Sequence, residues 1–194
     1  MTTERPALLW TEAGTDAESS ARDDLVQLGV WMFLATVLML FAAFTSAYVV
    51  RRSGSDWASI DLPQMLWVNT AVLIASSLAL EGGRRARSRG RSVSARLGLS
   101  VAIGLGLLFL VGQLTVWREL VGRGVYLPTS PHSAFVYILS GIHGLHILAG
   151  LLLLVYTLTK MDRRAATRLL MASATFWHFL AVLWIYLFVL VTAL

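Results

Sequence analysis

The chain has 194 residues, of which 57% are hydrophobic and 14% are charged, whereas a soluble domain carries about 25% charged residues. It contains no cysteine, which excludes disulfides, thiolate metal ligands and cysteine nucleophiles. Its net charge of +5 comes from basic residues grouped between apolar stretches. Such grouping is typical of topology signals and of contact with anionic lipid, so we expect no nucleic-acid partner.

Residues 1–24 form an acidic segment, which we expect to be a flexible cytoplasmic tail. A cleavable signal peptide starts with basic residues and has a shorter apolar core than the stretch that follows here, so none is expected. The acidic pair Asp23 and Asp24 ends the segment, and acidic side chains are favourable at the start of a helix.

Five apolar stretches follow, at about residues 25–50, 62–80, 97–117, 133–159 and 169–194. Each is close to the length that a helix needs to cross a hydrocarbon core of about 30 Å. Inside a bilayer every backbone N–H and C=O group must be paired, which favours α-helices. The predicted fold class is therefore all-α, an integral membrane five-helix bundle that occupies residues 25–194 as one domain.

Lysine and arginine residues predict which way round the bundle sits. Twelve of the 16 lie in residues 5–22, 84–96 and 160–168, and four lie in residues 51–52 and 118–123. Because basic loops stay on the cytoplasmic side, the N-terminus should be cytoplasmic and the C-terminus outside.

The second and third stretches contain polar and small residues. Asn69, Thr70, Ser76 and Ser77 are expected to form hydrogen bonds between helices rather than a substrate site. Four glycines in residues 98–112 allow close helix approach, and Gln113 lies near the outer end of the third stretch.

The last two stretches contain three histidines, of which His143 and His178 are expected near mid-membrane. His143 and His146 are three residues apart on one helix face, and His178 stands among aromatic residues. Intramembrane ionisable residues suggest function, and two interpretations are open: neutral imidazoles bonded to neighbouring helices, or a haem b held by His143 or His146 together with His178. A copper or zinc site is less favoured, because no carboxylate or cysteine lies nearby in the sequence.

The centres of all five stretches lack Asp, Glu, Lys and Arg. A proton pump or ion-coupled transporter usually needs buried carboxylates or a similar relay. The chain by itself therefore does not look like a pump, a transporter or an enzyme.

Short sequence strings in all five stretches point to one family. The chain resembles subunit III of haem–copper respiratory oxidases, in the short five-span bacterial form, from Leu28 to its end. The strings that carry the resemblance are residues 140–146 (SGIHGLH) and 176–179 (FWHF) with Trp184, supported by residues 29–34 (GVWMFL), 69–73 (NTAVL), Gln113 and Trp117.

The resemblance implies a non-redox accessory subunit of a bacterial terminal cytochrome c oxidase in the inner (plasma) membrane, with its C-terminus on the periplasmic side. It would support aerobic electron transport coupled to proton translocation. Partners would be the catalytic subunit I, subunit II, small subunits, a respiratory supercomplex and membrane lipids. Haem and copper would belong to the partner subunits, and phospholipid would bind in a cleft between a helix pair and a three-helix bundle.

No catalytic, cofactor-binding or metal-binding residue is expected in this chain. The candidates for lipid contact and packing that the resemblance implies are His143, His146, Trp177, His178 and Gln113.

The chain also departs from the family's pattern. Many members have carboxylates where this sequence has Val37, Val116 and Ala181, so no carboxylate role is carried over. Three alternatives remain open: a quinol oxidase subunit III, an accessory subunit of nitric oxide reductase, and a haem b membrane anchor.

Overall fold

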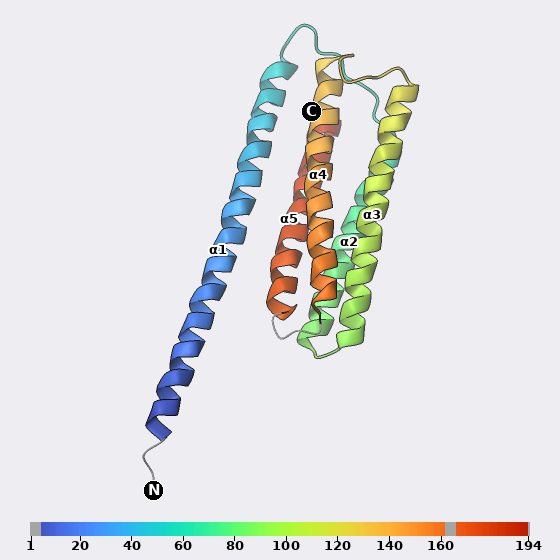
Figure 1. Ribbon diagram of the computed structural model, residues 1–194. Helices are drawn as coiled ribbons and strands as arrows, with labels where there is room; N and C mark the ends of the chain where they lie inside the picture. Colours follow the sequence, from blue (N-terminus) through green and yellow to red (C-terminus); the bar gives the residue numbers. More distant parts are fainter. Residues whose placement is uncertain (1–4, 162–165, 194) are drawn as a thin grey trace. The chain divides into compact units, whose positions relative to one another are not determined.

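The computed structural model describes residues 5–161 and 166–193, and in these ranges every regular element is a helix. The helices are α1 (Arg5–Arg52), α2 (Met65–Ser88), α3 (Ser92–Gly122), α4 (Pro131–Thr159) and α5 (Ala166–Ala193), as Figure 1 shows. Each contains a segment long and apolar enough to cross a membrane. The predicted all-α fold with five spans is confirmed, and the chain is a multi-pass membrane protein.

The chain divides into two compact units, Met1–Met39 and Leu40–Leu194. In the first unit, residues 5–39 form one uninterrupted helix, the longer part of α1. The segment expected to be a flexible tail is therefore helical from Arg5, which suits its several alanines and a proline in the first turn. Residues 1–4 lie outside the described residues, and a cytoplasmic location of the segment stays a prediction.

The helices of the second unit extend beyond the apolar stretches at several ends. α2 continues to Ser88 and α3 begins at Ser92, so the connection between them comprises residues 89–91. α3 likewise continues to Gly122. Hydropathy marks only the part of a helix suited to hydrocarbon, whereas ion pairs one turn apart, such as Glu119 with Arg123, keep polar ends helical.

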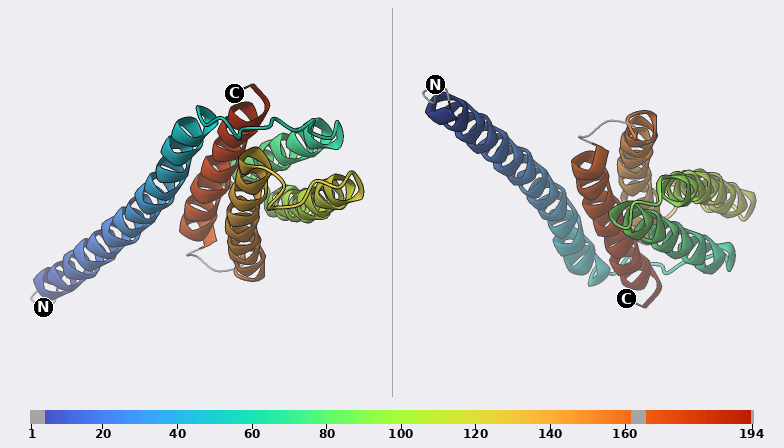
Figure 2. Two further views of the ribbon diagram at one scale, coloured as in Figure 1. Left: turned by 90° about the horizontal axis from the view of Figure 1, so that it is seen from above. Right: turned by 90° about the horizontal axis from the view of Figure 1, so that it is seen from below.

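In the second unit, α2 to α5 form a ring in which α2 adjoins α3, α3 adjoins α4, α4 adjoins α5, and α5 adjoins α2 (Figure 2). We call the end of this ring that carries the α1–α2 and α3–α4 connections the upper end, as drawn in Figure 1. The end that carries the α2–α3 connection is the lower end.

Near the lower end, the backbones of α2 and α3 lie close together at Gly83 and Gly98. A Cβ atom built on Gly98 would lie 2.6 Å from the Gly83 Cα and 2.7 Å from its nitrogen. The sequence predicted this close approach of α3 from its glycines, and the structure confirms it.

The expected grouping into a helix pair and a three-helix bundle with a lipid cleft stays a prediction. Among the described residues, the α2–α3 pair packs directly against α4 and α5. Two α5 side chains, Trp177 and Trp184, are buried at this packing and reach hydroxyl groups of α2.

Candidate functional site

Tryptophan side chains connect the helices through hydroxyl groups. The Trp177 Nε1–H of α5 donates to Ser76 Oγ of α2 at 3.2 Å, and the Ser76 hydroxyl donates to the Ala102 carbonyl of α3 at 2.7 Å. Trp184 donates in the same way to Thr70 Oγ1 of α2 at 3.0 Å, and the Thr70 hydroxyl donates to the Leu66 carbonyl at 2.9 Å. Each hydroxyl thus accepts from an indole and donates to a helix carbonyl, an arrangement that we call an indole relay.

A third indole relay joins α3 to α4. The Trp117 Nε1–H donates to Ser140 Oγ at 3.1 Å, and the Ser140 hydroxyl donates to the Val136 carbonyl at 2.5 Å. Because a buried indole N–H without a partner is costly in an apolar medium, the relays let large apolar rings enter the bundle without that cost.

Trp177 also fills the middle of the ring of helices. Its side chain is fully buried. A Cβ atom built on Gly106 of α3 would lie 2.7 Å from its ring, and one built on Gly150 of α4 would lie 3.1 Å from it. The two glycines therefore leave the space that the indole occupies.

Gln113, another predicted packing residue, pairs with an amide of α2. The Asn69 Nδ2–H donates to Gln113 Oε1 at 3.2 Å, and both side chains are buried. Gly112 makes room for this pair, because a Cβ atom there would lie 2.2 Å from Asn69 Oδ1. The prediction that polar residues of the second stretch bond between helices is confirmed here and at Ser76.

Replacing Asn69 or Gln113 by alanine is expected to lower the free energy of unfolding by about 1 kcal/mol each, because either change leaves a buried amide unpaired. The double variant should cost less than the sum, because it removes both amides. Unfolding by sodium dodecyl sulfate in mild detergent measures these differences, and Thr175→Ala, at an exposed hydroxyl bonded to its own helix, is the control. Additive costs would contradict the pairing.

His143 is fully buried in a cage of aromatic rings. Its ring centroid lies 4.9 Å from that of Trp184, 6.1 Å from that of Phe109 and 6.4 Å from that of Phe41. Neither of its ring nitrogens has a hydrogen-bond partner among the described residues. A neutral imidazole can keep such a position, since burying an ion there would cost far more.

The other two candidate histidines point to different neighbours. His146 places Nδ1 2.8 Å from the carbonyl oxygen of Ile142, one turn earlier on its own helix. His178 places Nδ1 2.5 Å from the Ser77 hydroxyl of α2. The structure therefore brings His143 and His146 to one region beside Phe41 but sends His178 to α2, which does not favour a haem shared between α4 and α5.

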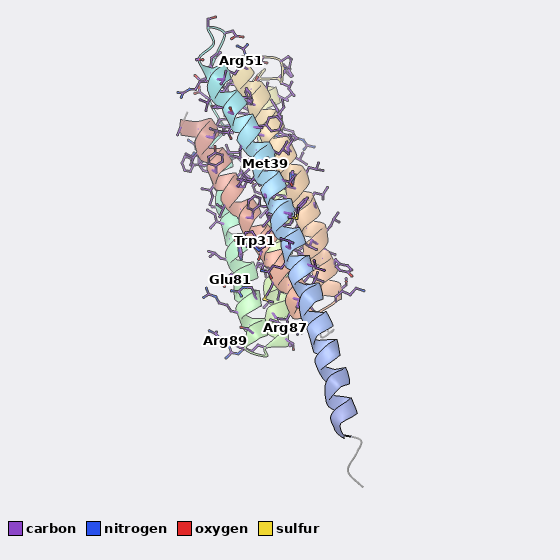
Figure 3. The ribbon with its side chains drawn as sticks, turned by 90° about the vertical axis from the view of Figure 1, so that its left-hand side faces the viewer. Trp31, Met39, Arg51, Glu81, Arg87 and Arg89 are labelled. Carbon is purple, nitrogen blue, oxygen red and sulfur yellow. The ribbon has the colours of Figure 1, made fainter. Side chains whose placement is uncertain are left out.

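Sequence analysis missed an ionic cluster around His178. Its Nε2 lies 3.6 Å from Glu81 Oε2, and Glu81 accepts hydrogen bonds of 2.7–2.8 Å from Arg84 and Arg85. Figure 3 shows Glu81 on α2, farther from the lower end than Arg87. The sequence could have indicated this cluster through the spacing of Ser77, Glu81 and Arg85, which places them on one face of a helix. In the part of the chain that the structure describes, no three His, Cys, Asp or Glu side chains gather as a metal site.

These features define a class: a helical multi-pass membrane protein whose buried polar groups mainly bond one another. The family model of cytochrome c oxidase subunit III matches residues 11–193, and the chain belongs to this family. It is thus an accessory subunit of an oxidase complex.

Similar proteins carry matching names. Those named probable cytochrome c oxidase subunit 3 of Mycobacterium tuberculosis H37Rv and cytochrome c oxidase subunit 3 of Corynebacterium diphtheriae are each 32% identical to this chain. The matches cover 88% of both chains in the first case and 87% in the second. Cytochrome bo(3) ubiquinol oxidase subunit 3 of Pseudomonas aeruginosa is 30% identical, over 84% of this chain and 82% of its own.

Proposed function

We propose that this chain is the non-redox subunit III of a bacterial terminal cytochrome c oxidase, that it packs on the catalytic subunit I, and that it binds phospholipid. It would sit in the inner membrane with the N-terminus and the lower end cytoplasmic. The names of the mycobacterial and corynebacterial relatives support cytochrome c as the electron donor. The distribution of basic residues supports the orientation.

The supportive role is inferred from the hydrogen bonds of the second unit, in which polar groups join one helix to another. The indole relays and the Asn69–Gln113 pair bind helices to one another. Large apolar side chains face outward along α3 and α4, among them Leu108, Val111, Leu114, Leu145, Leu148 and Leu152. A surface of this kind suits lipid chains or the helices of a partner subunit.

Co-purification tests the assembly. With an affinity tag on the N-terminal segment, mild detergent extraction is expected to yield this chain together with an equal amount of a haem- and copper-containing subunit I. Recovery of the chain alone, or with a nitric oxide reductase core, would contradict the proposal.

Deleting the chain tests the supportive role. Membranes of the deletion strain are expected to start oxygen reduction at close to the normal rate per metallated subunit I and to lose activity during turnover. Immediate and complete loss with an intact, fully metallated subunit I would show that the chain takes part in the reaction.

The identity of the electron donor can be tested by comparing cytochrome c with ubiquinol, since one relative is named as a ubiquinol oxidase subunit. Purified complex should consume oxygen with reduced cytochrome c and not with ubiquinol. The reverse result would assign the chain to a quinol oxidase.

A further inference from the structure

One histidine outside the predicted site joins three elements at the upper end. His132 is the second residue of α4 and is buried. Its Nδ1 accepts a hydrogen bond of 3.1 Å from the Ile60 backbone N–H, which belongs to the α1–α2 connection. Its Nε2 lies 3.3 Å from the Val191 carbonyl oxygen of α5. A single ring therefore holds a connection, the start of one helix and the end of another.

These two contacts define the protonation state of the ring. A backbone N–H can only donate, so Nδ1 of His132 must present a lone pair to Ile60. The ring proton then lies on Nε2, which donates to the Val191 carbonyl. If Nδ1 also gains a proton, two N–H groups face each other and the bond to Ile60 is lost, whereas the bond to Val191 survives.

Aromatic neighbours keep the His132 ring in place when Nδ1 is protonated. The Trp57 ring stacks on His132 with centroids 5.2 Å apart and planes at 23°, and Tyr48 meets the ring edge-on at 6.2 Å. Stacking on an indole also tolerates a positive ring, through a cation–π interaction. Protonation therefore breaks the hydrogen bond from Ile60 and leaves the stacking on Trp57 in place.

Charged groups near His132 come from α1 and from the connection. Arg52 of α1 lies within electrostatic range of the ring. In the connection, Asp61 follows Ile60, and its backbone carbonyl oxygen is 3.4 Å from Arg123 Nη1. The Arg51 guanidinium bonds Asp56 and holds the pKa of that carboxyl below its usual range, so Asp56 stays charged and paired with Arg51.

We propose that His132 is a pH-sensitive latch, which holds the α1–α2 connection at Ile60 while its imidazole is neutral and releases it when the aqueous phase at the upper end becomes acidic. With the orientation given under the proposed function, that phase is the periplasm. The latch itself depends only on the contacts of His132, so its test is independent of the orientation and of the electron donor.

Hydrogen exchange of the Ile60 amide in the detergent-solubilised complex tests the latch. After correction for intrinsic exchange, its rate is expected to rise about tenfold or more between about pH 7.5 and about pH 4, a range that extends below the usual titration of an imidazole because this ring is buried. The Leu66 amide, which donates to the Pro63 carbonyl at 3.0 Å, is the internal control and should not change. Unchanged protection of Ile60 in the wild-type protein at the acidic end overturns the proposal, with no variant needed.

A pair of variants assigns the effect to the ring nitrogen. In His132→Asn, the amide oxygen can accept from Ile60 near the position of Nδ1 and cannot titrate, so protection should be the same at both pH values. In His132→Phe, the ring is kept but the acceptor is lost, so exchange should be fast at both. A rise with acid in His132→Asn as large as in the wild type would also overturn the proposal.

Discussion

Replacing Gly98 by alanine is expected to lower the free energy of unfolding by about 3 kcal/mol, although it adds a single methyl group. The new Cβ atom would lie 2.6 Å and 2.7 Å from the Cα and nitrogen atoms of Gly83. Those are backbone atoms of α2, so they cannot move aside by a change of rotamer. The two helices must separate, which weakens every contact along their shared face.

Gly104→Ala on the same helix is the matched control. Nothing lies within 4 Å of a Cβ atom at that position. The change should be neutral or stabilising by up to about 1 kcal/mol, since alanine favours helix more than glycine does. Unfolding of both variants by sodium dodecyl sulfate in mild detergent provides the comparison. Equal effects of the two substitutions would contradict close α2–α3 packing at Gly98.

Replacing Trp177 by alanine is expected to cost about 3–5 kcal/mol of unfolding free energy and to reduce recovery of the folded subunit. The substitution leaves a cavity between α3 and α4 beside Gly106 and Gly150, which cannot fill it. It also removes the donor to Ser76.

Two further variants separate the causes. Trp177→Phe keeps one aromatic ring and loses the indole N–H and part of the ring volume, so it should cost about 1 kcal/mol for the missing hydrogen bond plus a packing loss smaller than that of Trp177→Ala. Trp67→Ala, at a side chain that is 64% exposed, should cost much less than Trp177→Ala. Thermal denaturation in mild detergent measures all three, and a loss at Trp67 equal to that at Trp177 would contradict the central position of Trp177.

The positions of the five spans could be predicted because bilayer thickness sets a length and hydropathy marks it in each segment separately. Helix ends were less predictable. Residues 83–91 look like a basic loop by composition, yet α2 continues to Ser88 and Glu81 pairs with Arg84 and Arg85 within it. Such pairing is visible in the spacing of charges but not in an average of hydropathy.

Contacts between spans depend on how each helix is rotated, and the sequence contains little information on that. Ser76 could be expected to bond another helix, but its partner Trp177 is 101 residues away in the chain. His143 and His146 were correctly placed on one face, whereas the link from His178 to Ser77 and Glu81 required the structure. The sequence did not single out His132, because it lies at the end of a predicted loop, outside the apolar stretches.

The close contact of Gly83 with Gly98 has a consequence for the order of assembly. Only three residues, 89–91, separate α2 from α3, so the two glycines can meet as soon as both helices have entered the bilayer. Little chain entropy is lost in closing so short a connection. During synthesis this hairpin is therefore expected to form first. It would then present Trp117 to α4 and the hydroxyls of Ser76 and Thr70 to α5 when these helices emerge from the ribosome.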